Sequence, residues 1–161
     1  MKVPRGLWPY ALILAAALAV QAYRGRDVAQ GLAPPLSGAI VSGRFFDLAQ
    51  LRGKPALVYF WATWCGVCKA MQHNIDALAG DVPLITVALQ SGDAVAVGRF
   101  LQERGIVQPV LLDEDGEAAA RYGIRGVPAA FVLGPDGAIR YVALGYSSEW
   151  GLRLRLWLAE R

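Results

Sequence analysis

In the first half of the folded part of the chain, continuous apolar runs alternate with segments in which apolar residues recur at helical spacing. Residues 56–61 (ALVYFW) and 82–89 (VPLITVAL) are almost continuously apolar and have the length of strands buried on both faces. Apolar positions recur at helical spacing from Cys65 to Gly80, where a glycine can end a helix, and again over residues 92–105. This order predicts two successive strand–helix units, the arrangement from which parallel sheets are built.

Shorter elements flank these two units. A Ser-Gly pair between two β-prone stretches predicts a small hairpin over residues 38–54. Further along, the pattern predicts a strand over residues 109–113, a short helix over 116–123 and two strands within 128–145, joined by a turn at Pro135-Asp136-Gly137. Strands that alternate with helices indicate an α/β fold with a central mixed sheet and helices on both faces.

The last segment, residues 147–159, fits two patterns. Leucines alternate with arginines over residues 152–156, as in a strand with one buried face. Four apolar residues also share one face of a helix: Trp150, Leu154, Trp157 and Leu158. We expect a helix, because a sheet in this architecture needs a cover on its second face.

A membrane anchor is predicted near the N-terminus. Residues 7–23 (LWPYALILAAALAVQAY) carry no charge. As a helix this run spans about 25 Å, close to the shortest length that crosses a bilayer. Lys2, Arg5 and the terminal amine slightly outweigh the basic residues on the other side, which Asp27 partly offsets. This bias favours an N-terminus inside the cell and a domain outside it.

The apolar run divides the chain into four predicted parts. Residues 1–6 are the cytoplasmic N-terminus, 7–23 a transmembrane anchor or uncleaved signal, 24–37 a tether, and 38–161 the folded domain. The tether is predicted from two adjacent prolines and the lack of apolar periodicity. A cleaved signal peptide is the alternative, because a Val-Gln-Ala stretch at the end of the run loosely fits a cleavage site. In both cases we expect an exported domain.

The net charge of +3 comes from the N-terminal segment. Four of the 16 basic side chains and none of the 13 acidic ones lie within residues 1–26, which leaves 12 basic and 13 acidic side chains from Asp27 onward. A nearly neutral domain without a basic stripe offers no surface for nucleic acid. We therefore expect no nucleic-acid partner.

The two cysteines of the chain stand in the stretch WATWCGVCKAM, residues 61–71, where the first long strand meets the first helix. A helix that begins near Cys65 directs its unpaired N–H groups and its dipole toward that sulfur, and both stabilise the thiolate. Cys68 lies one turn later, within reach of Cys65 for a disulfide. Thiol–disulfide exchange needs such a pair. We predict that Cys65 is the exposed, attacking sulfur and that Cys68, the shielded one, resolves the mixed disulfide.

Other roles are open to the same two cysteines. A structural disulfide that closes so short a loop would add little stability. Zinc needs about four ligands, and only His73 could join the two thiolates. Copper(I) accepts two thiolates, with Met71 as a further candidate, so a copper-binding or copper-stress module is the alternative function. For the preferred function we expect no metal and no cofactor beyond the disulfide itself.

Two stretches resemble signatures of the thioredoxin superfamily. LVYFWATWCGVCK, residues 57–69, looks like its active-site segment, and YGIRGVPAAFVLGPDG, residues 122–137, resembles its second signature. The resemblance implies a thioredoxin-like three-layer sandwich and a cis peptide bond before Pro128, beside the cysteine pair. Carried over residue by residue, it also implies five residues that bind the partner chain: Trp64, Gly66, Val67, Val127 and Pro128.

A narrower resemblance concerns the branch of the superfamily. FDLAQLRGKPALVYFWATWC resembles the membrane-anchored TlpA/ResA-like branch, and WATWCGVCK together with LITVALQSGD most resembles the ScsD-type protein disulfide oxidoreductases. This resemblance implies a single-pass protein of the bacterial inner membrane with its domain in the periplasm. It also implies partners that are protein thiols or disulfides.

The chain departs from the family pattern at several positions. The buried acid that thioredoxins carry six residues before the first cysteine is Tyr59 here, so that proton relay is missing. Gly66-Val67 between the cysteines has neither the proline of reductases nor the histidine of strong oxidants. A peroxiredoxin pattern would place proline and threonine where Val58 and Ala62 stand, so we expect no peroxidase activity.

The direction of electron flow stays open, with reduction of partner disulfides slightly favoured. A handful of pKa effects around the sulfurs decides the reduction potential of such a pair. A reductase needs a separate transmembrane electron donor and an oxidase needs a separate acceptor, because one short apolar segment cannot carry electrons across the bilayer.

Overall fold

The computed structural model describes residues 12–13 and 27–161, so most of the predicted anchor over residues 7–23 lies outside the described residues. Within the part that is described, no helix has both the length and the apolar character needed to span a bilayer. The strands are β1 (Gly31–Leu32), β2 (Ser37–Ala39), β3 (Phe45–Asp47), β4 (Ala56–Trp61), β5 (Leu84–Leu89), β6 (Val110–Asp113), β7 (Ala129–Leu133) and β8 (Ala138–Leu144). The helices are η1 (Leu48–Leu51, 3-10), α2 (Gly66–Asp76), α3 (Ala94–Arg104), α4 (Glu117–Arg121) and α5 (Glu149–Ala159).

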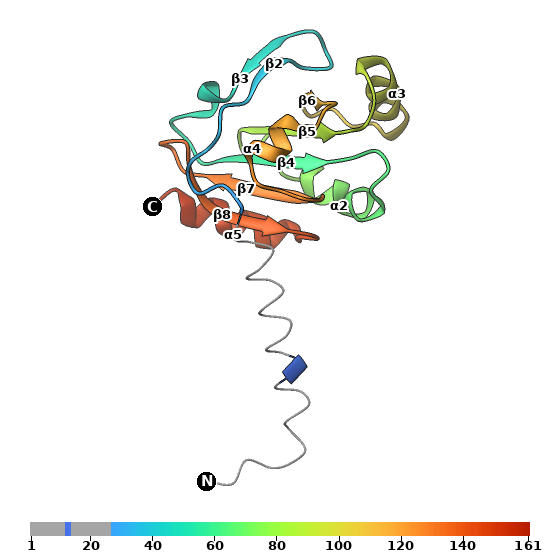
Figure 1. Cartoon of the computed structure of the whole chain (residues 1–161). Helices are drawn as coiled ribbons and strands as arrows, with labels where there is room; N and C mark the ends of the chain where they lie inside the picture. Colours follow the sequence, from blue (N-terminus) through green and yellow to red (C-terminus); the bar gives the residue numbers. More distant parts are fainter. Residues whose placement is uncertain (1–11, 14–26) are drawn as a thin grey trace, which may run out of the picture.

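Six strands form one mixed sheet in the order β1-β8-β7-β4-β5-β6, and β2 pairs with β3 as the predicted hairpin (Figure 1). β4, β5 and β6 are mutually parallel, whereas β7 and β8 run antiparallel to their neighbours. Every residue of β4 and β5 is buried, as the two continuous apolar runs predicted. Strands of this kind belong in the centre of a sheet covered on both faces.

Alternate residues of β4 face two different cores, because successive side chains of a strand point to opposite faces. Tyr59 and Trp61 pack in the core that α2, α3 and α5 cover. Val58 and Phe60 pack in the core on the other face, which α4 and residues 28–46 cover. The resulting layers confirm the predicted thioredoxin-like sandwich, and α5 confirms the choice of a helix for the last segment.

Capping residues mark the ends of several helices. The Asp93 side chain caps the start of α3, Gly105 ends that helix with a φ of 64°, and Ser148 caps α5. The prediction that the first helix runs to Gly80 is wrong, because α2 ends at Asp76. In the residues that follow, backbone hydrogen bonds that span three residues instead of four become common, as at many helix ends.

The predicted tether over residues 24–37 is wrong for the part that the structure describes. β1 pairs with β8 and extends the sheet by one strand. The Ala29 N–H donates to the Tyr122 carbonyl (3.0 Å), and the Tyr122 hydroxyl donates to the Pro34 carbonyl (2.9 Å). Residues 28–36 therefore belong to the domain. They lack periodicity because backbone hydrogen bonds and two separate buried side chains, Val28 and Leu36, attach them rather than one continuous apolar face.

Candidate active site

The two cysteines lie at the junction of β4 and α2, as the sequence predicted, and form a disulfide. Their Cα atoms are 5.3 Å apart. Cys65 is the N-cap residue of α2, and its sulfur accepts a hydrogen bond of 3.0 Å from the Cys68 N–H. An unpaired N–H at a helix N-terminus thus points at the first sulfur. This is the local arrangement that stabilises negative charge there.

The predicted exposure of Cys65 is not observed in this disulfide form. Its exposed fraction is 7%, against 3% for Cys68, and both cysteines belong to the buried core beneath α2. The Cys65 sulfur lies 3.6 Å from the Val127 carbonyl oxygen, so a distant loop covers it. In the disulfide form the Cys65 sulfur is therefore not freely exposed to solvent.

The loop that covers Cys65 contains the cis peptide bond between Val127 and Pro128, as the resemblance implied. It leads directly into β7, the antiparallel neighbour of β4. This pairing is what brings residues 62 positions apart in sequence into contact. The cysteine pair and the predicted Val127–Pro128 segment therefore form one site.

A groove runs beside this loop. Predicted and unpredicted residues line it together: Gly123, Ile124, Arg125, Gly126, Val127, Pro128, Leu144 and Gly145. The Gly145 N–H donates to the Pro128 carbonyl (2.8 Å), which joins the end of β8 to the loop. Leu144 and Gly145 were not predicted from the sequence, because only the pairing of β7 with β8 places them there.

The other predicted binding residues, Trp64, Gly66 and Val67, lie at the surface around the disulfide. The exposed fractions are 60% for Trp64 and 49% for Val67, which is high for large apolar side chains. The Trp64 indole N–H donates to the Gln90 carbonyl (3.1 Å), so the ring is held in place although it is exposed. A fixed, exposed aromatic ring provides apolar contact area at little entropic cost.

Two residues that follow β5, Gln90 and Ser91, support the active-site segment through hydrogen bonds. The sequence did not predict this role for either of them. The Thr63 N–H donates to the Ser91 hydroxyl (3.0 Å), which in turn donates to the Leu89 carbonyl (3.0 Å). Gln90 has a φ of 43°, a conformation that is strained for a residue other than glycine. In this conformation its carbonyl accepts from Trp64. No local sequence signal marks these contacts.

The alternative metal ligands do not gather around the sulfurs. Among the described residues, no group of three or more His, Cys, Asp or Glu side chains could hold a metal ion. Met71 is fully buried in the core, and His73 is exposed with its Nδ1 3.1 Å from the Ala70 carbonyl. A copper site would thus have to form from the two cysteines after their disulfide is reduced.

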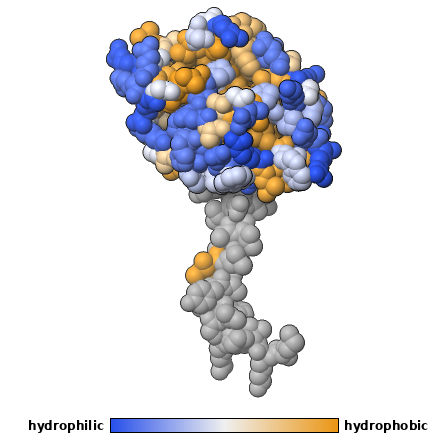
Figure 2. Space-filling view, turned by 180° about the vertical axis from the view of Figure 1, so that it is seen from behind, coloured by the Kyte–Doolittle hydropathy of each residue, from blue (hydrophilic) through white to orange (hydrophobic). Residues whose placement is uncertain are grey.

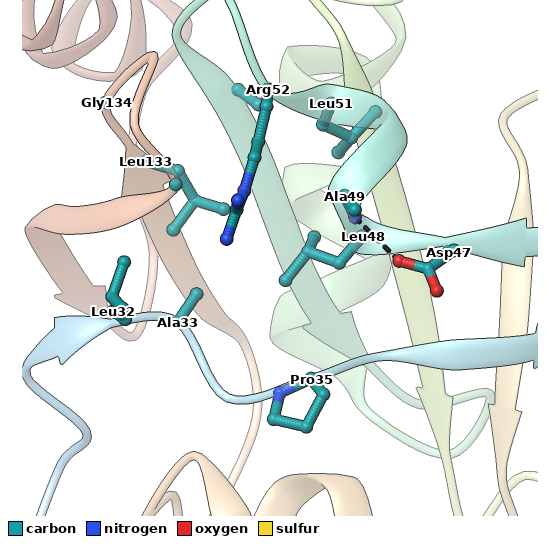
Figure 3. A pocket seen from close by; sticks show the side chains of 12 residues that line it. Leu32, Ala33, Pro35, Asp47, Leu48, Ala49, Leu51, Arg52, Leu133 and Gly134 are labelled. Atoms are coloured by element: carbon teal, nitrogen blue, oxygen red, sulfur yellow. Dashed lines mark hydrogen bonds between the residues drawn. The ribbon is translucent and has the colours of Figure 1, made fainter.

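Figure 3 shows a second pocket, at the opposite end of β4 from the cysteines. The Arg52 side chain extends into it between Leu133 and Leu48, and the Asp47 carboxylate accepts from the Ala49 N–H (2.8 Å). Ala56, the first residue of β4, also lines this pocket, whereas the cysteines follow the last. This pocket is therefore separate from the chemistry of the disulfide.

Tyr59, which occupies the position of the thioredoxin acid, lies in the same buried core as both cysteines. Burial raises the pKa of its phenol well above the ordinary value, so the group stays protonated. Among the buried side-chain polar atoms of the described residues, its hydroxyl is the one that lacks a hydrogen-bond partner. A buried donor without a partner destabilises the fold.

Substitution Tyr59→Phe is expected to raise the free energy of unfolding by about 1 kcal/mol, because it removes an unsatisfied hydroxyl and keeps the ring. Tyr122→Phe is the matched control. Tyr122 is equally buried, but its hydroxyl donates to Pro34, so its loss is expected to lower the free energy of unfolding by about 1 kcal/mol. Urea denaturation measures both variants. Equal losses would show that the Tyr59 hydroxyl has a partner after all.

Comparison with known proteins places these features in a family. A family model described as AhpC/TSA matches residues 30–142, a range that begins within the segment predicted as a tether. A thioredoxin-like protein of Haemophilus influenzae is 36% identical over 122 residues, which is 74% of this chain and 72% of that protein. The thiol-disulfide oxidoreductase ResA of Bacillus subtilis is 30% identical over 115 residues, which is 67% of this chain and 63% of ResA.

A solved structure supports the same relationship. The structure described as MTB dsbF in its mixed oxidized and reduced forms matches with a TM-score of 0.69 and 27% identity, covering 77% of this chain and 94% of that chain. The predicted resemblance to the thioredoxin superfamily and to ResA-like proteins is therefore confirmed. The closer resemblance to ScsD-type proteins stays a prediction.

Proposed function

We propose that the chain, which belongs to the AhpC/TSA family and is a thioredoxin-like thiol–disulfide oxidoreductase, works as a membrane-anchored enzyme with its domain in the bacterial periplasm. The observation that carries the activity is the Cys65–Cys68 disulfide at the start of α2, against the Val127–Pro128 loop. The uncharged run over residues 7–23 and its basic flanks support the anchor and its orientation.

The proposed reaction exchanges two electrons with a partner protein. In the reducing direction, the Cys65 thiolate attacks a partner disulfide, forms a mixed disulfide and releases one partner thiolate. The Cys68 thiolate then attacks the Cys65 sulfur, which releases the second partner thiolate and closes the Cys65–Cys68 disulfide. The partner takes up two electrons and two protons. A separate transmembrane electron donor restores the dithiol.

The partner is proposed to bind as an extended segment along the groove beside Pro128. The loop offers backbone groups of Gly126 and Val127, of which Gly126 is exposed and Val127 is half-buried. Trp64 and Val67, close to the disulfide in sequence, add exposed apolar surface. Backbone recognition with a few apolar contacts suits an enzyme that accepts several partner sequences.

We favour the reducing direction because of the groups that surround the two sulfurs. A strong oxidant needs a reduced form in which the attacking thiolate is strongly stabilised. Here the Cys68 N–H and the start of α2 stabilise it, and Gly66 and Val67 between the cysteines add no charge or side-chain donor. A modestly stabilised thiolate corresponds to a low potential.

The reduction potential of the pair tests this direction. We expect a value near that of thioredoxin, about −270 mV, for the full chain in detergent equilibrated with glutathione buffers. A value between about −120 and −180 mV would contradict a reductase and indicate an oxidant or isomerase that needs an electron acceptor. Quantifying the free thiols by alkylation and mass spectrometry gives the reduced fraction in each buffer.

A further inference from the structure

The outer face of α5 consists of large apolar side chains that are largely exposed to solvent. The exposed fractions are 78% for Trp150, 56% for Leu154, 51% for Trp157 and 38% for Leu158. The spacing of these residues places them on one side of the helix. The buried residues Leu152, Leu156 and Ala159 occupy the opposite side, toward the sheet.

Charged residues of α5 do not shield this face. Arg153 is held at its flank by Glu149 and Asp81, with contacts of 2.7 and 2.8 Å. Arg155 turns back to donate to the Gly151 carbonyl (2.9 Å). A helix on the surface of a soluble domain usually presents polar residues to water. Two exposed tryptophans and two leucines on one face therefore mark a surface that binds something.

The chain leaves little room between the domain and the proposed anchor. The apolar run ends at Tyr23, and residues 28–36 belong to the domain. Four Cα–Cα steps join Tyr23 to Asp27, and at about 3.3–3.6 Å per residue they reach at most about 14 Å. An anchor over residues 7–23 therefore holds the domain against the membrane surface rather than at a distance from it.

α5 and the first residues of the domain lie near the same edge of the sheet, although they cover opposite faces of it. β1, the first strand, pairs with β8 at the edge of the sheet, and α5 packs on β7 and β8. Figure 1 shows α5 at the bottom of the domain, on the same side as the start of the described chain near residue 27. Figure 2 shows the domain from behind, with apolar residues among hydrophilic ones in its lower part.

We propose that the outer face of α5 inserts into the headgroup region of the bilayer that holds the N-terminal anchor. This proposal rests on the anchoring proposed above. Tryptophan favours the membrane interface, where its ring is half in apolar surroundings, and leucine adds apolar area. Arg161 stacks on Trp157, 4.1 Å from the ring centroid, and supplies a cation for lipid phosphates.

A second copy of the chain fits this face less well. The four side chains expose on the order of 400 Å². A stable protein–protein interface buries about 800 Å² on each partner. Contact with a lipid surface does not need to bury this much area. The anchor already holds the domain beside the membrane, so a weak contact is sufficient to orient the domain. Docking on α5 would fix the height of the disulfide above the bilayer.

Quenching of tryptophan fluorescence by brominated phospholipid tests the proposal on the full chain. The chain has five tryptophans, and Trp8→Phe removes the one in the anchor. This variant is reconstituted into vesicles of phosphatidylethanolamine and phosphatidylglycerol with or without brominated acyl chains. We expect bromolipid to remove up to about half of its emission, because two of the four remaining tryptophans lie on α5. Adding Trp150→Phe and Trp157→Phe should abolish this loss.

The controls separate this proposal from the anchoring on which it rests. Trp64→Phe in the same background removes a similarly exposed ring near the disulfide and should leave the quenching intact. Flotation of the vesicles reports insertion of the chain. If the chains float but their quenching does not depend on Trp150 and Trp157, the docking alone is overturned. Dimers cross-linked through α5 would also overturn the docking and leave the anchor standing. Chains that do not float would overturn the anchor and the docking together.

Discussion

Replacing Cys65 with serine lowers the rate of disulfide exchange by about 10³-fold or more, because the substitution removes the attacking nucleophile. Cys68 cannot take its place, since it lies inside the first turn of α2, where the residue is 3% exposed. Reduction of insulin disulfides by the dithiol form measures the rate. Circular dichroism is the control for folding. The core changes by one atom, so we expect no loss of the fold.

Replacing Cys68 with serine has a different result from the same assay. Cys65 still attacks, but the mixed disulfide no longer resolves, so a covalent complex with the partner accumulates. Non-reducing electrophoresis detects the complex, and reduction with dithiothreitol releases the partner. The double variant, without either sulfur, should trap nothing. If Cys65→Ser traps partners and Cys68→Ser does not, the two roles are reversed.

Gly123→Ala is expected to lower the free energy of unfolding by about 2–4 kcal/mol, through overpacking and a strained backbone. Gly123 has a φ of 66°, which side chains other than glycine rarely adopt, and a Cβ there would overlap the Asp27 carbonyl. The contact joins the groove loop to the residues that enter the domain. The substitution should therefore detach residues 27–29 from Tyr122 as well as destabilise the fold.

Gly126→Ala is the matched control for this prediction. Gly126 lies three residues further along the same loop, its φ is not positive, and a Cβ added there would meet no other atom within 4 Å. Its effect should stay within about 0.5 kcal/mol. Urea denaturation measures both variants, and limited proteolysis reports whether residues 27–29 come loose. Equal stability of the two variants would contradict the packing of the N-terminal segment.

The central elements could be predicted because local patterns encode them. β4 is buried at all six positions, and its continuous apolar run predicted its bounds correctly. The helices α3 and α5 begin after Asp93 and Ser148, whose side chains accept hydrogen bonds from the first turns that follow them. These signals act over a few residues and do not depend on the rest of the fold. The cysteine pair at the start of α2 is likewise local.

The rest of the site depends on pairing between distant segments. Gln90 reaches Trp64 because β5 lies parallel to β4, and both strands end at the same edge of the sheet. Leu144 joins the groove because β8 pairs with β7. Neither residue carries a local signal for this role, since its contribution is a backbone group or a position. A sequence pattern can therefore find the reacting sulfurs more readily than the residues that hold them.

The sequence by itself determined the order of the elements from β4 to α5, the reactive cysteine pair and the neutral character of the domain, because periodicity, spacing and charge are properties of short segments. Only the tertiary structure decided that residues 28–36 belong to the domain, since they are attached through backbone hydrogen bonds to Tyr122 and β8. It also decided which face of α5 is buried. Both faces are apolar in sequence, and only packing on β7 and β8 leaves Trp150 and Trp157 outside.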